Sequence, residues 1–108
     1  MACRGSHTLN DIPYFVLDDK LVRIEADGTS TALAGTITGS GPVSMAENGT
    51  QLCILDPGGD GFIYTTAGGL VEITDSDFRA NGNPTAVTYI DGYFLFTTDT
   101  KKIIVCSL

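Results

Sequence analysis

Short apolar runs alternate along the whole chain with turns rich in glycine and aspartate. The runs are too short for amphipathic helices, and they carry apolar residues at successive positions. The turn pairs that separate them are Asp27-Gly28, Asn48-Gly49, Asp60-Gly61, Gly68-Gly69 and Asp91-Gly92. Asn-Gly and Asp-Gly supply the positive φ angles that tight hairpins need. The pattern therefore predicts a string of β-hairpins, with room for one helical turn at residues 75–80.

The hairpins form an internal repeat. The first run of each unit follows a turn and ends on an aspartate, namely Asp18, Asp56 or Asp99. A second run follows each aspartate, at residues 21–24, 62–65 and 103–106, and a further run completes the first two units at residues 31–37 and 70–74. The unit recurs about every 40 residues, which is the length of a β-propeller blade. We expect the three aspartates to hold one structural position and to cap turns by accepting backbone N–H bonds.

The repeat predicts an all-β fold of antiparallel four-stranded β-propeller blades, in a single domain over residues 1–108. The blade units are expected at residues 4–37, 43–74 and 85–108. A β-trefoil also has three four-stranded units and stays open as an alternative, as does an irregular sandwich. Because β-propellers have about four to eight blades, three blades need a second copy or further sequence to close a ring. The third unit lacks a fourth run, so we also expect a strand edge that invites pairing.

Charge narrows the possible partners. The chain has 6 Lys and Arg against 13 Asp and Glu, a net charge of −7. Phosphate backbones and anionic lipid surfaces would repel it, so direct nucleic-acid and membrane binding are disfavoured. No apolar run matches a secretory signal or a membrane span, and we expect a soluble protein made in the cytoplasm.

Several segments resemble one known family. They are Arg4-Gly5, Tyr14-Phe15-Val16-Leu17, Lys20-Leu21, the stretch 39–46 and Asn48-Gly49-Thr50-Gln51-Leu52. Together they resemble the N-terminal region of the packaged DNA stabilization proteins of short-tailed bacteriophages, which form the tail hub that closes the portal. The resemblance implies a β-propeller-rich virion protein at the head–tail junction, made in the host cytoplasm. It also implies binding to portal-adaptor and other tail proteins, and no catalysis.

The residues themselves offer little chemistry. His7 is the only histidine, and we expect it to be an ordinary surface or strand residue. The loop that holds Asp56 and Asp60 lacks the ligand spacing of a calcium loop, so a solvated hairpin is favoured over a metal site. Cys53 and Cys106 lie in apolar runs, and with Cys3 the cysteines are expected to be buried free thiols. We predict no catalytic residue, cofactor or metal.

Three functions follow from these observations. The leading hypothesis is a non-enzymatic phage virion protein that stabilises packaged DNA through protein–protein contacts, including contacts with a second copy of itself. A small glycan- or ligand-binding β-repeat module is the alternative. An enzyme that uses a divalent ion at Asp56 and Asp60 is a third, weaker hypothesis.

Overall fold

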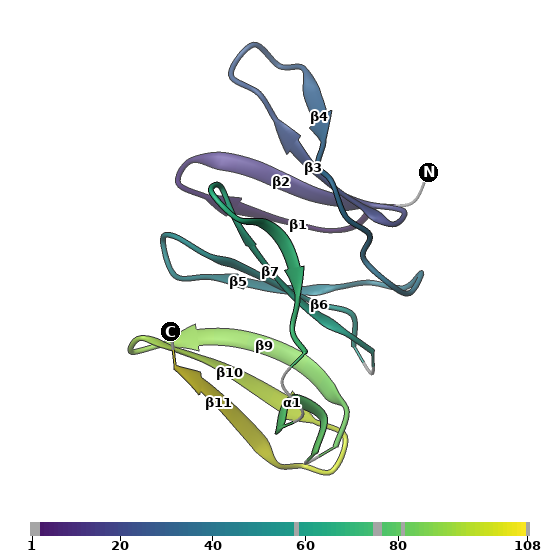
Figure 1. Cartoon of the computed structure of the whole chain (residues 1–108), viewed down its shortest axis with the longest axis vertical. Helices are drawn as coiled ribbons and strands as arrows, with labels where there is room; N and C mark the ends of the chain where they lie inside the picture. The colour runs from purple at the N-terminus through teal and green to yellow at the C-terminus, as the bar shows by residue number, and fades with distance from the viewer. Residues whose placement is uncertain (1–2, 58, 75–76, 81, 108) are drawn as a thin grey trace.

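The computed structural model describes residues 3–57, 59–74, 77–80 and 82–107, and these residues form three antiparallel sheets stacked along the long axis of the molecule (Figure 1). Blade 1 contains β1 (Cys3–Leu9), β2 (Ile12–Leu17), β3 (Lys20–Ile24) and β4 (Ser30–Ala32). Blade 2 contains β5 (Ser44–Glu47), β6 (Leu52–Leu55), β7 (Gly61–Thr65) and β8 (Gly69–Glu72). Blade 3 contains β9 (Pro84–Ile90), β10 (Tyr93–Thr98) and β11 (Ile103–Ser107), and the short helix α1 (Asp77–Ala80) precedes it.

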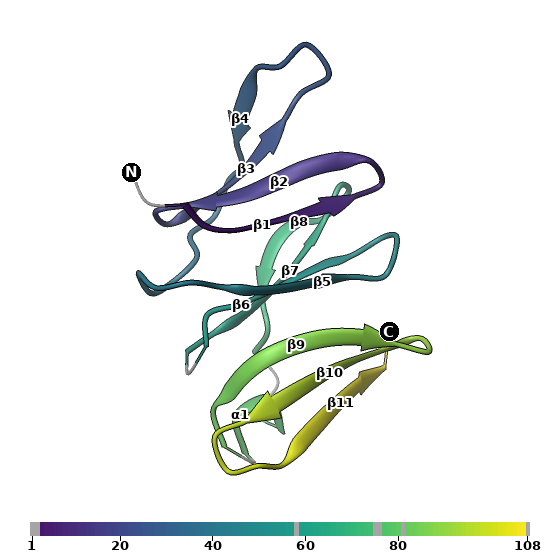
Figure 2. The same ribbon diagram turned by 180° about the vertical axis from the view of Figure 1, so that it is seen from behind.

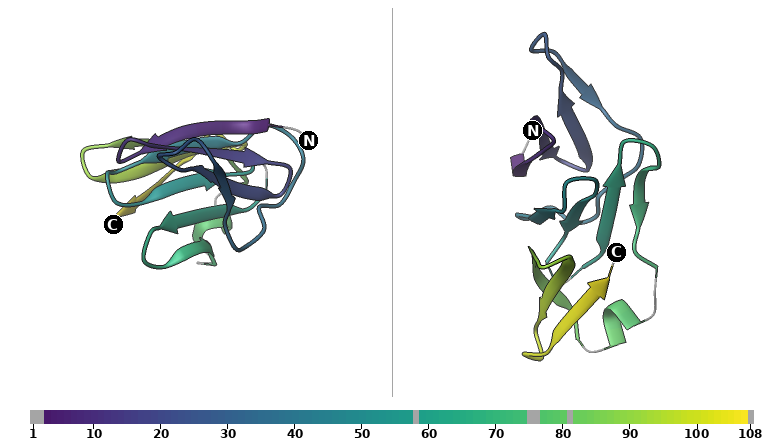
Figure 3. Two further views of the ribbon diagram at one scale, coloured as in Figure 1. Left: turned by 90° about the horizontal axis from the view of Figure 1, so that it is seen from above. Right: turned by 90° about the vertical axis from the view of Figure 1, so that its left-hand side faces the viewer.

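The predicted propeller blades are confirmed. Within each sheet the strands follow chain order, and β1, β5 and β9 of successive blades are neighbours along one edge (Figure 2). The sheets run away from this common edge toward their outer strands (Figure 3). Separate sheets that pack face to face match propeller blades rather than the β-trefoil, and the ring is not closed.

The turn chemistry explains the hairpins. Gly49 has a φ of 95°, and the Asp91-Gly92 pair has φ angles of 52° and 88°. Two successive positive φ angles define the two-residue turn whose twist matches the flanking strands. The helical turn foreseen at residues 75–80 is present as α1, while residues 75 and 76 lie outside the described part of the chain. The fourth strand of blade 1 is shorter than predicted and ends at Ala32, although the backbone N–H groups of Leu33 and Ile37 still donate to the Leu21 and Asp19 carbonyls.

Two apolar cores hold the blades together. The core between blades 1 and 2 contains Tyr14 and Val16 on one side, and Ile54 and Phe62 on the other, with Ile37 of the connecting segment inserted between them. The core between blades 2 and 3 joins side chains of both sheets to Phe78 of α1, whose ring meets that of Phe96 edge to face at 5.0 Å. Burial of each such side chain contributes about 1.5–3 kcal/mol.

Blade 2 is therefore covered on both faces. All four residues of β6 are buried: Leu52 and Ile54 belong to the first core, and Cys53 and Leu55 belong to the second. This explains the run of consecutive apolar residues that favoured blades in the sequence.

One prediction about the repeat is wrong. Leu17 pairs with Lys20 across a two-residue turn, whereas the backbone N–H groups of Asp56 and Thr98 donate to the carbonyls of Asp60 and Lys102. Asp56 is thus the last paired residue of its hairpin and matches Leu17 and Thr98. Asp18 and Asp99 instead begin their turns, so the three aspartates do not share one position. Blades 2 and 3 have loops of equal length between these paired residues, so the aspartate of blade 2 stands one position earlier in its hairpin for a reason other than loop length.

Candidate interaction surface

The outer face of blade 3, which points away from blade 2, is an apolar surface. Opposed residues of an antiparallel pair lie on the same face, and the register defines two rows: Ala86, Thr97 and Ile103, then Thr88, Leu95 and Val105. The Ile103 and Val105 side chains are 62% and 57% exposed. Ile90 and Tyr93 pair beside these rows and are also exposed.

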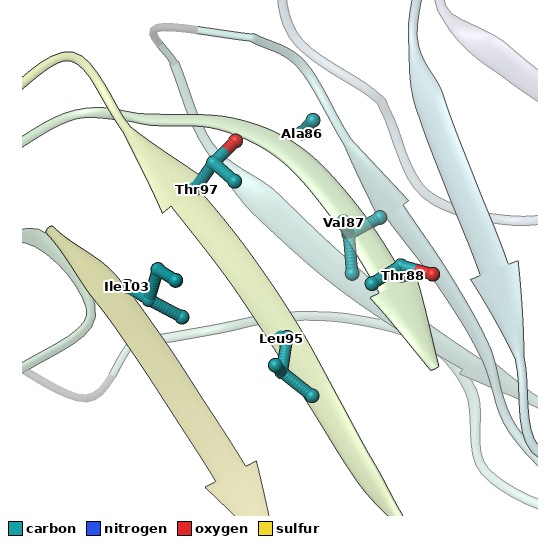
Figure 4. A pocket seen from close by; sticks show the side chains of 6 residues that line it. All are labelled: Ala86, Val87, Thr88, Leu95, Thr97 and Ile103. Atoms are coloured by element: carbon teal, nitrogen blue, oxygen red, sulfur yellow. The ribbon is translucent and has the colours of Figure 1, made fainter. Parts of the chain in front are cut away.

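A shallow groove crosses this outer face. Its volume is about 300 Å³, and its lining comes from all three strands of the sheet. Figure 4 shows the lining residues Ala86, Val87, Thr88, Leu95, Thr97 and Ile103. None of them is charged or carries an amide side chain, so the groove suits an apolar partner group rather than a sugar or an ion.

The same face of the other two blades is an interblade contact. Leu95 and Thr97 lie three residues and one residue before Thr98, the last paired residue of the blade 3 hairpin. Cys53 and Leu55 lie at the same distances before Asp56 in blade 2, so the two pairs are equivalent. They likewise match Tyr14 and Val16 of blade 1, and in both blades these residues are buried against the next sheet. Within the described residues no element covers the corresponding face of blade 3. The outer face of blade 3 is therefore equivalent to the faces of blades 1 and 2 that pack against the next sheet.

The other end of the stack carries the opposite surface. On the outer face of blade 1, Phe15 pairs with Ser6 on one side and with Val22 on the other, and Val22 pairs with Ala32. The Phe15 side chain is half-buried, and Val22 is buried. Phe15 matches Phe96, since each lies two residues before the last paired residue of its hairpin.

Arg4 joins blade 1 to blade 2. An extra residue in β1 produces a register shift between Cys3 and Gly5, at the position of Arg4, whose side chain is 1% exposed. Its Nε donates to the Gly41 carbonyl at 2.7 Å, and Nη2 donates to the Thr38 carbonyl at 2.6 Å. Nη2 also lies 3.4 Å from Oδ1 of Asp56.

The remaining Arg4 donor completes this anchor. Nη1 donates to the carbonyls of Asp18 at 3.0 Å and Ile37 at 3.3 Å. The guanidinium thus gathers the turn of blade 1, the connecting segment and the loop of blade 2. Its charge-assisted bonds satisfy the buried Ile37 carbonyl and three carbonyls in partly buried positions. The residue pattern marks Arg4 only as part of the family resemblance and not as an anchor, because its acceptors are scattered over the chain.

Tyr14 of β2 and Arg23 of β3 lie opposite each other in the paired strands of blade 1. The Tyr14 hydroxyl is buried and has no hydrogen-bond partner among the described residues. Burial, followed by the neighbouring Tyr64, raises the pKa of Tyr14 to about 12. Nε of Arg23 donates to Oε1 of Glu25 at 2.6 Å, and this bond lowers the pKa of the Glu25 carboxyl.

The residues considered for chemistry do not converge. His7 borders a groove of about 320 Å³ across β1, β5 and β9, where Glu47 and Tyr89 also lie. The Thr38 hydroxyl donates to Asp60 at 3.1 Å and lies 3.4 Å from Asp56 Oδ2. No group of three His, Cys, Asp or Glu residues with the geometry of a metal site occurs within the described residues. In the same part of the chain, no helix is long and apolar enough to cross a membrane.

Two other predictions have clear outcomes. Cys53 is buried and forms no disulfide, as expected, whereas the expected burial is wrong for Cys3, which is exposed; the side chain of Cys106 lies outside the described residues. Asp99 accepts the backbone N–H of Asn83 at 3.0 Å and so has a structural role, but Asn83 lies just before β9 and not in the turn that Asp99 begins. The Asp56 carboxylate serves the Arg4 anchor instead.

Stacked antiparallel sheets joined from outer strand to inner strand define the chain as a set of β-propeller blades. Residues 2–108 match the phage stabilisation family described as "Bacteriophage P22 Gp10, beta-propeller". The chain belongs to this family, which supports a structural role in a phage and confirms the resemblance seen in the sequence. A comparison with curated proteins gives no match.

Solved structures show the same fold. The selenomethionine-substituted virginiamycin B lyase from Staphylococcus aureus matches with a TM-score of 0.61 and 15% sequence identity, covering 99% of this chain and 41% of the lyase. A catalytically inactive variant of that lyase with quinupristin matches with a TM-score of 0.61 and 14% identity, again over 41% of the lyase. The chain thus spans about two-fifths of the length of these structures. At this identity the similarity shows the fold alone.

Proposed function

We propose that the chain acts in the phage particle as a component of the tail hub, at the head–tail junction, where it helps to retain packaged DNA. The observation that carries the proposal is the family match over residues 2–108. The role is non-catalytic and works through protein–protein contacts with portal-adaptor and other tail proteins. Contacts between copies of the chain are included among these.

The surface chemistry supports this role. The groove on the outer face of blade 3 is uncharged and apolar, as expected of a surface that packs against protein. The net charge of −7 disfavours adhesion to the DNA itself. The groove on blade 3 does not favour a glycan, since it lacks amide, charged or paired carboxylate groups.

A phage that encodes this chain provides the test. Disruption of the gene is expected to give particles that package DNA and then lose it, measured as the ratio of filled to empty heads by electron microscopy and by nuclease protection. Complementation with the wild-type chain should restore filled heads. Disrupted particles that keep their DNA would refute the proposed role. Immunogold labelling at the head–tail junction tests the location separately.

A further inference from the structure

We infer that the groove between the outer strands of blades 1 and 2 binds a carboxylate group that is carried on a short apolar stem. The Arg23 guanidinium holds the carboxylate, and the buried Tyr14 hydroxyl donates a hydrogen bond to it. A glutamate side chain of a partner polypeptide and a free short-chain carboxylic acid share this chemistry. The inference goes beyond the proposed phage role and does not depend on it.

The groove has polar and apolar walls, and both belong to this chain. It lies between β3 and the segment after β4 on blade 1, and β7 and β8 on blade 2, with a volume of about 330 Å³. Leu33 of blade 1 and Leu70 of blade 2 are partly buried and provide apolar walls. Among the described residues that line the groove, Arg23 alone is charged. The groove therefore suits an anionic group with an apolar stem.

Arg23 retains donors for a ligand. Glu25, followed by Tyr64, raises the pKa of the guanidinium. Nε donates to Glu25 at 2.6 Å, whereas neither Nη1 nor Nη2 makes a hydrogen bond of normal geometry to a described residue. The Arg23 side chain is 29% exposed, so a ligand can reach it from solvent. Its terminal N–H groups match the two oxygens of a carboxylate.

The charge around Arg23 selects the type of anion. The Glu25 carboxylate already offsets one positive charge, because it accepts the Nε hydrogen bond. A second, doubly charged group would be repelled by Glu25 more strongly than a singly charged one. A carboxylate is therefore favoured over a phosphate dianion.

The buried hydroxyl of Tyr14 is an independent observation that points to the same ligand. The Tyr14 side chain is fully buried, and its hydroxyl has no hydrogen-bond partner among the described residues. Buried polar groups are nearly always hydrogen-bonded, so such an exception needs an explanation. Arg23 lies opposite Tyr14 in the strand register, and the Tyr14 and Tyr64 rings are 5.2 Å apart. After burial, Tyr64 and Arg23 are the groups that act on the pKa of this hydroxyl.

The position of these neighbours connects the hydroxyl to the groove. Arg23 and Tyr64 both line the groove, one from each blade. A ligand oxygen that binds between them therefore lies within reach of the Tyr14 hydroxyl. The phenol donates to that oxygen while the guanidinium balances its charge.

The test is an NMR titration of the full chain with butyrate, with the capped peptide acetyl-Gly-Glu-Gly-amide and with inorganic phosphate. Butyrate and the peptide should produce saturable shifts of the Arg23 Nε signal and of the Gly68 and Gly69 amides, which line the groove. Phosphate should bind more weakly than either. Peptide binding tighter than butyrate binding by about tenfold would identify a polypeptide as the source of the carboxylate. Equal affinities would identify a free acid, and both results support the site.

Three substitutions assign the binding groups. Arg23→Met should abolish the shifts, and Tyr14→Phe should weaken binding by about tenfold, which corresponds to one hydrogen bond to a charged group. Glu25→Gln should strengthen binding several-fold, because it removes the negative charge beside Arg23. An increase in affinity cannot arise from misfolding. Tyr93→Phe is the matched control and should bind like the wild type, since Tyr93 is 45% exposed and lies on blade 3.

Several results would overturn the inference. The absence of saturable shifts with both carboxylates would exclude the site. Phosphate binding as tight as that of butyrate would refute the choice of a carboxylate. Affinities that Arg23→Met or Tyr14→Phe leaves unchanged would refute the assigned roles, as would weaker binding to Glu25→Gln. None of these results bears on the phage role, which the gene disruption tests separately.

Discussion

The substitution Arg4→Met tests the anchor between blades 1 and 2. Methionine retains much of the apolar length of arginine, but it removes the donors to four carbonyls and the ion pair with Asp56. Breaking a buried ion pair by removing one partner costs about 3–5 kcal/mol. The Asp56 side chain is 16% exposed, and water can reach it after the change. We therefore expect a loss at the lower end, about 3 kcal/mol.

That loss is a large fraction of the stability of a small domain, which is about 5–15 kcal/mol. It should lower the melting temperature by about 12–24 °C, at about 4–8 °C per kcal/mol for a domain near this size. Urea unfolding followed by circular dichroism gives the free energy directly. Since the anchor links two blades, a reduced slope of unfolding against urea would also show that the blades had become uncoupled.

Arg23→Met is the control. Arg23 also lies on blade 1 and pairs with a carboxylate, but the Arg23 and Glu25 side chains are 29% and 35% exposed. Solvent screens such pairs, and their net contribution to stability is small. Equal effects of the two substitutions, or a loss below about 1 kcal/mol for Arg4→Met, would refute the reasoning that burial and the carbonyl acceptors make Arg4 important.

Three other predictions concern single positions. Gly39→Ala should destabilise the chain more than Gly28→Ala in urea unfolding, because both glycines have φ above 80° but only a Cβ at position 39 meets a neighbouring carboxylate; equal losses would contradict this. A thiol reagent followed by peptide mapping should modify Cys3 rapidly and Cys53 only on unfolding; rapid modification of Cys53 in the folded chain would contradict its burial. The free energy of unfolding should fall by about 2–3 kcal/mol between pH 10 and 12, because the unfolded Tyr14 ionises near pH 10 and the folded one near 12. Tyr14→Phe should remove that part of the fall and cost little at pH 7, and an unchanged pH profile would contradict the assignment.

The fold was accessible from the sequence because its signals are local. Asn48-Gly49 and Asp91-Gly92 impose turns through their own backbone preferences, and the apolar run at β6 reports burial on both faces. The register of each hairpin was harder to predict. Asp56 is the last paired residue of its hairpin, whereas Asp18 and Asp99 lie one position beyond it, which no local preference reveals.

The interaction surfaces were harder to predict from the sequence, because the exposure of a side chain depends on which element packs opposite it. Ile103 and Ile104 are identical in type and adjacent, yet Ile103 is exposed while Ile104 packs against the second core. Arg4 could not be recognised as an anchor either, since its acceptors run from residue 18 to residue 56. Only the assembled blades bring these groups together.

Burial of β6 on both faces also determines which opening motions expose its backbone amides to solvent. Its amides bond to β5 and β7, and both faces of the strand lie beneath another blade. A local fluctuation that lifts either terminal sheet still leaves the opposite face of β6 shielded. Hydrogen–deuterium exchange at these amides should therefore occur only through complete unfolding, while β4 and β11 exchange much sooner. The β6 amides should therefore exchange more slowly than those of the terminal sheets, and their protection factors would measure the global stability of the stack.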